Sequence, residues 1–130
     1  MNYVKLSGAV VALSVSSFAG AQDYQFIAAD NNPMTKLCVS IANNDLSATK
    51  ARLYNMGLGA AIRQNINRIT CNDMSTAQFA HKFKASDTFV YLNNRSSYAN
   101  KEKPSVTISD IAKVESSQQP VVVYVSAAPK

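Results

Sequence analysis

The sequence has few of the residues from which catalytic sites are built. Among its 130 residues there is one histidine, His81, and no serine lies within a G-x-S-x-G motif. A serine or cysteine hydrolase needs a nucleophile with a base in reach, and a single imidazole is present to serve as that base. A lone histidine on the edge of a predicted helix is most often an ordinary surface residue. We therefore predict no catalytic residue and a chain that is not an enzyme.

The chain also lacks the motifs of metal and nucleotide sites. It contains no C-x-x-C pair, no D-x-[DN]-x-[DN]-G calcium loop, no Walker loop and no G-x-G-x-x-G. Residues 30–32 and 43–45 carry oxygen ligands that calcium binds, but each stretch lies where a helix cap explains it. The spacing of the acidic residues does not exclude a glycosidase-like carboxylate pair, although the chain has only eight of them. We predict neither a metal nor a cofactor.

A long apolar run occurs only at the start of the chain. Lys5 gives a short positive region, residues 6–18 are apolar, and residues 19–21 are the small residues that a signal peptidase needs. The alternative is a transmembrane anchor. The run is too short for one, contains several serines and is not followed by a positively charged stop-transfer cluster. We predict a signal peptide over residues 1–21, cleaved near Ala21. Residues 22–130 would then form one small periplasmic or secreted domain without a membrane span.

The prediction of export bears on Cys38 and Cys71, the two cysteines of the chain. In an oxidising compartment, an even pair in a small exported protein is expected to form a disulfide. The alternative, a reactive thiol or a metal ligand, has no His/Cys cluster in its favour. The sequence thus predicts a bridge from Cys38 to Cys71, which is worth about 3.5 to 4 kcal/mol in the chain-entropy model.

Helical signals fill the first half of the predicted mature domain. Asn32 followed by Pro33 is typical of a helix start, because the asparagine can cap a free N–H and proline lacks one. Asp45 is placed to cap a second helix. Gly57 is placed to end that helix, because glycine adopts the left-handed conformation without a Cβ penalty.

Two further helices are predicted before residue 86. Isoleucines at helical spacing indicate a helix over residues 60–67, followed by an irregular or extended stretch over residues 69–71. Ser75 and Gln78 have the spacing of a capping box, in which each side chain binds a backbone N–H at the helix start. The helix that follows them carries His81 towards its polar side.

After residue 86 the sequence favours strands. Three stretches rich in β-branched and aromatic residues are predicted to be strands: residues 88–92, 105–109 and 121–125. A weak strand or ordered lead-in is predicted around Phe26 and Ile27. Residues 93–104 are predicted to be an exposed polar loop, and residues 110–119 either a helical turn or a polar linker.

The order of these elements predicts an α+β fold. Helices come first and strands later, which is not the alternation of βαβ units. We expect a small disulfide-linked helical module of three to four helices over residues 32–85. A strand-rich segment over residues 87–126 would follow it within the same domain.

The charge balance gives a mild basic excess. Loss of the signal peptide removes one lysine and no acid, so the formal net charge falls from +5 to about +4. Arg95, Lys101 and Lys103 lie in the predicted loop and are candidate anion-binding residues, with Tyr91 or Tyr98 as stacking platforms for a single strand. The alternative is that these cations are dispersed solubilising charges.

Two blocks of the sequence carry a resemblance to a known group of proteins. The first is K-L-C-V at residues 36–39, and the second is C-N-D at residues 71–73, leading to Phe79 and Ala80. With these blocks, residues 26–83 resemble a family of small exported proteins of Gram-negative bacteria that is classed as a domain of unknown function. The resemblance implies a two-cysteine helical module secreted across the inner membrane. It implies no catalytic residue.

These observations lead to a hypothesis about function. We expect a small, disulfide-bonded, non-enzymatic binding or structural protein of the bacterial envelope. Its partner would be an envelope protein or an anionic polymer. The alternatives are anionic polymer or nucleic-acid binding through Arg95, Lys101 and Lys103, and, with less support, a small hydrolase that uses His81.

Overall fold

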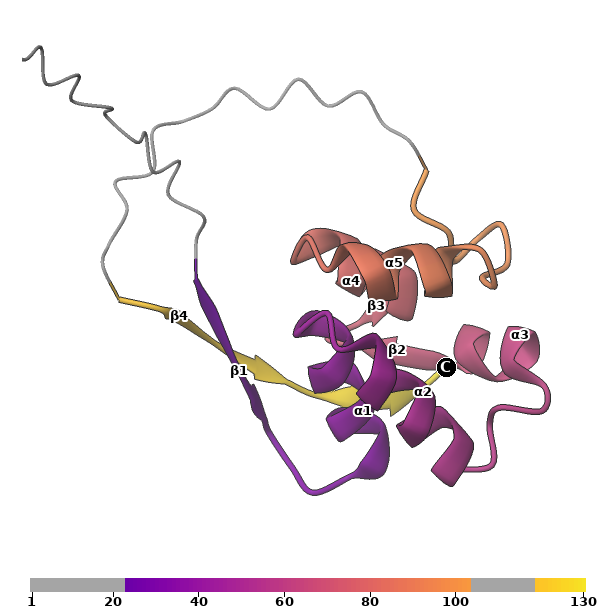
Figure 1. Ribbon diagram of the computed structural model, residues 1–130, viewed down its shortest axis with the longest axis horizontal. Helices are drawn as coiled ribbons and strands as arrows, with labels where there is room; N and C mark the ends of the chain where they lie inside the picture. Colours follow the sequence, from indigo (N-terminus) through magenta and orange to yellow (C-terminus); the bar gives the residue numbers. More distant parts are fainter. Residues whose placement is uncertain (1–22, 104–118) are drawn as a thin grey trace, which may run out of the picture.

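The structure is a computed structural model that describes residues 23–103 and 119–130, and these residues adopt a mixed α+β fold (Figure 1). In chain order the elements are β1 (Tyr24–Ala28), α1 (Pro33–Ala42), α2 (Leu46–Asn55), α3 (Ile62–Asn65), the 3-10 helix η1 (Ile66–Arg68), β2 (Ile69–Cys71), β3 (Met74–Ser75), α4 (Thr76–Lys82), α5 (Ser86–Asn93), β4 (Val121–Val125) and β5 (Ala127–Pro129). The predicted fold class is confirmed.

The predicted signal peptide and the predicted strand over residues 105–109 lie outside the described residues. The same holds for residues 110–118 of the segment for which the sequence allows either a helical turn or a polar linker. None of the helices in the described part of the chain has the length and apolar content needed to cross a membrane.

The helix starts follow the local sequence signals. The Asn32 side chain accepts a hydrogen bond from the Met34 backbone N–H (2.9 Å) at the start of α1. The Asp45 side chain accepts one from the Ala48 N–H (2.9 Å) at the start of α2. At the start of α4, Ser75 forms the predicted capping box. Each side chain supplies a partner for an N–H that the helix itself leaves free.

Three helices end in the same left-handed turn. The residues that follow α1, α2 and α4 in this conformation are Asn44, Gly57 and Lys84, with φ of 57°, 70° and 56°. The next N–H then reaches back to a helix carbonyl, with N–O distances of 3.0, 2.9 and 2.9 Å: Asp45 to Ser40, Leu58 to Leu53, and Ala85 to Ala80. This is the Schellman arrangement, and it satisfies carbonyls at the helix end. Gly57 confirms the prediction made from the sequence.

A buried disulfide lies in the core of the helical module. Cys38 of α1 and Cys71 of β2 are bonded, with their Cα atoms 5.7 Å apart, and both are fully buried. Leu37, Ile41 and Phe79 are fully buried in the same hydrophobic core. The bridge joins the first helix to the strand that precedes the capping box, which confirms the predicted pairing.

The prediction of a strand over residues 88–92 is wrong, because these residues belong to α5. Thr88 and Leu92 are four residues apart and both fully buried, so they lie on one helical face. The N-terminus of α5 is capped from a distant part of the chain. The Asn44 side-chain oxygen accepts hydrogen bonds from the N–H groups of Asp87 (2.8 Å) and Thr88 (3.1 Å). Residues 32–85 contain the four α-helices α1 to α4, within the predicted three to four, and α5 adds a helix where the strand-rich segment was predicted to begin.

The helix predicted over residues 60–67 is shorter than expected. α3 covers Ile62–Asn65, and the 3-10 helix η1 follows it before the chain becomes extended in β2. The extended exit over residues 69–71 is confirmed. β-branched Ile69 and Thr70 favour this extended backbone.

The strands form two small sheets. β1 pairs with β4 in parallel, and β2 pairs with both β3 and β5 in antiparallel, which gives the order β3-β2-β5. β4 and β5 follow one another almost along a line, while the start of the β1–β4 pair reaches beyond the helices (Figure 1). The strand predicted over residues 121–125 is confirmed, as is the N-terminal strand around Phe26 and Ile27.

Candidate functional site

The candidate site is the two-stranded ribbon that β1 and β4 form. Tyr24 lies opposite Val121, and the strands stay in register to their ends. The Val121 N–H donates to the Asp23 carbonyl (2.9 Å), and the Ala29 N–H donates to the Val125 carbonyl (2.8 Å). In a parallel pair the backbone groups of successive residues point alternately towards and away from the partner. These two bonds therefore fix which groups of each strand face outwards.

The inner face of the ribbon packs on the helical module. The Phe83 ring, at the end of α4, lies 5.2 Å from the Tyr24 ring and 4.8 Å from the Phe26 ring, both edge-on. Phe79 continues the cluster at 5.1 Å from Phe83. Val125 of β4 is fully buried on this side. Edge-on aromatic contacts and apolar burial thus hold one face of the ribbon in place.

The outer face of the ribbon is exposed and carries no charge. The register places Gln25 beside Val122 and Ile27 beside Tyr124. Side chains alternate across a strand, so these four residues share the face opposite the aromatic cluster. Val122 is 44% exposed, Ile27 36% and Tyr124 67%. This face is an uncharged and mainly apolar surface on a parallel pair, although parallel sheets are usually covered on both faces.

Asn72 ties the ribbon to the disulfide-linked module. It follows β2 with φ of 45°, and asparagine tolerates this left-handed conformation better than most residues. The Asn72 side chain donates to the Tyr124 carbonyl (3.1 Å) and accepts from the Ser126 N–H (2.7 Å). One side chain thus fixes the point where β4 passes into β5.

A carboxylate marks the end of β1. A hydrogen bond from the Thr35 side chain and another from the Asn32 backbone N–H (2.9 Å) lower the pKa of Asp30 below its ordinary value. Asp30 is therefore ionised at neutral pH. β1 itself, Tyr24–Ala28, contains no charged residue.

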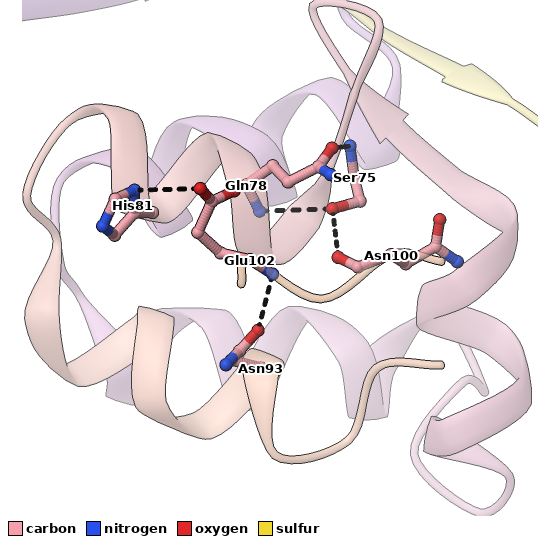
Figure 2. A network of polar contacts seen from close by, with 6 residues as sticks. All are labelled: Ser75, Gln78, His81, Asn93, Asn100 and Glu102. Atoms are coloured by element: carbon pink, nitrogen blue, oxygen red, sulfur yellow. Dashed lines mark hydrogen bonds and ion pairs between the residues drawn. The ribbon is translucent and has the colours of Figure 1, made fainter. Parts of the chain in front are cut away.

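Figure 2 shows a polar network around the start of α4. The Ser75 hydroxyl donates to the Asn100 carbonyl (2.6 Å) and accepts from the Gln78 N–H (3.2 Å). On the other side of the network, the Asn93 side chain accepts from the Glu102 N–H (3.0 Å). The Ser75 proton is engaged with a carbonyl, so the hydroxyl serves as a cap. Asn100 is buried, unlike most of the predicted loop around it.

His81 lies at the edge of this network. Its Nδ1 is 3.8 Å from Glu102 Oε1, its side chain is 55% exposed, and its ring centroid is 5.1 Å from that of Phe89. His81 and Ser86 border one cavity of about 220 Å³. Within the described residues, no hydrogen bond joins the Ser86 hydroxyl to the imidazole. His81 therefore has a carboxylate beside it and no nucleophile hydrogen-bonded to it.

The three candidate anion-binding residues do not share one site. Lys101 and Lys103 border a cavity of about 330 Å³ together with Gln78. Arg95 borders a different cavity and donates to the Tyr91 carbonyl (2.9 Å), with its guanidinium 3.9 Å from the centre of the Tyr91 ring. Arg95 is thus engaged with α5, the helix that precedes it, and the two lysines form a separate pair.

One of the two predicted stacking tyrosines also has a cation over it within that pair. Lys103 Nζ lies 4.6 Å from the centre of the Tyr98 ring. This contact holds the ammonium beside an aromatic face. A stacked base at Tyr98 would therefore meet a positive charge.

Metal binding has no support among the described residues. Over residues 23–103 and 119–130, no three His, Cys, Asp or Glu side chains lie together as a metal site would need. Both cysteines are consumed by the disulfide.

Comparison with protein-family models, with curated proteins and with solved structures gives no match for this chain. The family resemblance of residues 26–83, and the bacterial origin and export that it implies, therefore stay predictions. The two-cysteine domain with a disulfide is established by the structure itself.

The sequence predicts the two strands of the ribbon separately but does not predict their pairing, so it does not indicate a site here. One signal for an open strand is present in the sequence: the stretch V-V-V-Y-V at residues 121–125 contains no charge or proline that would protect an exposed strand.

Proposed function

We propose that this protein is exported to the bacterial envelope and acts there, without catalysing a reaction, by binding another envelope protein through the outer face of the β1–β4 ribbon. The observation that carries the proposal is the exposed, uncharged face of Ile27, Val122 and Tyr124. An apolar face left open on a parallel pair is a surface that favours a covering partner.

The chemistry of the face selects the class of partner. An anionic polymer needs cations to neutralise its charge, and none of the four outer-face residues is basic. A protein with an apolar, uncharged patch matches the face better. Tyr124 adds a hydroxyl to an apolar ring, and tyrosines of this kind are enriched in protein interfaces.

The polar network supports the non-enzymatic part of the proposal. The Ser75 hydroxyl donates to a backbone carbonyl, and the one imidazole is more than half exposed to solvent. A general base in a water-accessible position, without a hydrogen-bonded nucleophile, does not form the set that acyl transfer requires.

The test is photo-crosslinking in intact Gram-negative cells that express the full chain. A photoreactive phenylalanine analogue replaces Tyr124 in one variant and Tyr54 in the matched control, because Tyr54 is 79% exposed and lies on α2. We expect a discrete adduct with an envelope protein from position 124. It should disappear when Val122→Asp is added and should be missing from position 54. Equal labelling from both positions, or none from 124, would contradict the proposal.

Export is tested in the same cells. Mass spectrometry of the protein purified from the periplasm should give an N-terminus at Gln22. A cytoplasmic protein that retains Met1 would contradict export.

A second function, binding of an anionic polymer, is favoured by the cavity that Lys101 and Lys103 share. The probe is a short single-stranded DNA, with purified lipopolysaccharide as an envelope polyanion. Binding should weaken steeply as salt rises, and Lys101→Glu with Lys103→Glu should abolish it. Arg95→Glu is the matched control, since Arg95 borders a different cavity. Equal losses from both changes would contradict a site at the lysine pair.

A further inference from the structure

The outer edge of β1 is a row of free backbone groups. The bonds from Val121 to Asp23 and from Ala29 to Val125 show that odd-numbered residues of β1 face β4. The N–H and C=O groups of Tyr24, Phe26 and Ala28 therefore point the other way. Within residues 23–103 and 119–130, no group hydrogen-bonds to them. An edge of this kind is a template for another strand.

The corresponding edge of β4 is shorter. By the same alternation, the groups of Val122 and Tyr124 face away from β1. The Tyr124 carbonyl is already occupied by the Asn72 side chain (3.1 Å), and the chain beyond Ser126 pairs with β2. β1 therefore offers the longer uninterrupted edge.

The edge also lacks the features that protect natural sheet edges. Proteins place lysine, proline or bulges on such strands, and the Y-Q-F-I-A sequence of β1 contains no lysine or proline. Its register with β4 has no bulge. The edge is open to one more strand.

We propose that a second copy of this chain adds its β1 to this edge, in antiparallel orientation, about a twofold axis at Phe26. Phe26 then lies opposite Phe26 of the second copy, and Tyr24 lies opposite its Ala28. These three residues are the ones whose backbone groups point outwards. Each opposed pair can exchange two hydrogen bonds, so the twofold axis pairs every outward-facing donor and acceptor of β1 in both copies.

The side chains are compatible with this arrangement. Phe26 lies at the axis and belongs to the inner-face aromatic cluster with Tyr24 and Phe83. The clusters of the two copies are therefore in contact through the two Phe26 side chains. Asp23 falls opposite Ala29 of the second copy, which keeps like charges apart. The resulting sheet has the order β4-β1-β1-β4. Its outer faces stay open, so self-pairing uses the edge of the ribbon and the proposed envelope partner uses its face.

The register is tested by a disulfide trap. Directly opposed, hydrogen-bonded residues have Cα atoms about 5.5 Å apart, which suits a disulfide. A mixture of Tyr24→Cys and Ala28→Cys proteins should give a covalent heterodimer under mild oxidation. Each variant alone should give little, since two copies of residue 28 lie about 14 Å apart along the strands. Cys38 and Cys71 are buried and bonded, so they do not compete.

The control mixture is Tyr54→Cys with Tyr98→Cys, two exposed positions away from the ribbon. Heterodimer formation no greater than in this control overturns the proposal. Heterodimer formation at least tenfold greater supports it.

The edge is tested by sedimentation of the purified exported chain over rising concentration. Ala28→Pro removes one outward N–H from β1, and Val122→Pro removes one from the open edge of β4 as a matched control. We expect a concentration-dependent dimer that Ala28→Pro shifts to monomer and Val122→Pro leaves unchanged. A wild-type monomer at every concentration overturns the proposal, and so does a dimer lost only in Val122→Pro. A monomer that still crosslinks through Tyr124 in cells refutes self-pairing while the proposed function stands.

Discussion

The helical module and the β1–β4 ribbon differ in how completely their backbone groups are paired. In the module, side chains cap α1, α2, α4 and α5, and left-handed turns close three helix ends. In the ribbon, one face packs on the module while the other face and one full edge have no partner in the described residues. The module has the pairing expected of a stable scaffold, and the ribbon has the open groups expected of a binding element.

The same contrast holds for charged and polar side chains. The conspicuous polar groups, Ser75, Asn44 and Asn72, each serve as a cap or a tie within the fold. The surface proposed for binding consists of Gln25, Ile27, Val122 and Tyr124, none of which is charged. Under the proposed function, the binding surface is marked by groups without a partner in the described residues and not by side chains typical of catalysis or metal binding.

The largest expected difference between the two regions is in apolar packing. Phe79→Ala in the module should lower the free energy of unfolding by about 3–5 kcal/mol, because the ring is fully buried and leaves a cavity. Tyr124→Ala on the outer face should change it by less than about 0.5 kcal/mol. Urea denaturation followed by circular dichroism measures both. Comparable losses in the two variants would mean that the outer face is part of the core.

The disulfide should have the next largest effect. Replacing both cysteines by serine should cost about 3–4 kcal/mol, because the bridge closes a loop with a sequence separation of 33. Urea denaturation of the variant, and of the reduced wild type as control, checks this value. Thiol titration of the folded wild type should find no free thiol. Two reactive thiols would contradict the bridge.

The tie between the two regions should have an intermediate effect. Asn72→Gly keeps the left-handed backbone accessible and the backbone bond to the Ser126 carbonyl, but it removes the side-chain bonds to the Tyr124 carbonyl and the Ser126 N–H. We expect a loss of about 1–3 kcal/mol in the free energy of unfolding. Hydrogen exchange should accelerate at the Ser126 amide more than at the Leu53 amide, which lies within α2. Uniform acceleration would show that Asn72 stabilises the whole domain instead of the junction.

The smallest predicted effect is a gain of stability at a helix end. Lys84 has φ of 56°, a conformation that disfavours a residue with a Cβ. Lys84→Gly should therefore raise the free energy of unfolding by about 1 kcal/mol. Lys84→Ala, which keeps the Cβ, should change it by less than about 0.5 kcal/mol. Thermal denaturation compares the two, and equal effects would contradict a backbone origin.

The module could be predicted where its signals are local. The cap at Asn32, the capping box of Ser75 and Gln78, and the stop at Gly57 each depend on residues a few positions apart, and all are confirmed. The cysteine pairing was predictable because only two cysteines are present.

The remaining features depend on contacts that local sequence does not encode. Residues 88–92 favour a strand by composition, yet the cap from Asn44 and the burial of Thr88 and Leu92 make them helical. The parallel pairing of β1 with β4 joins segments from opposite ends of the described chain. Nothing in either strand alone specifies the other. The separation of Arg95 from Lys101 and Lys103 likewise follows from the three-dimensional path of the chain.

The distance in sequence between β1 and β4 has a consequence during synthesis. β1 emerges early, and the residues that form the disulfide follow it long before β4 is made. Chains are made at about 5–20 residues per second, so several seconds separate the synthesis of β1 from that of β4. During this interval the helical part can collapse while β1 has no strand on either side. A nascent chain thus passes through a stage in which β1 is exposed along both edges.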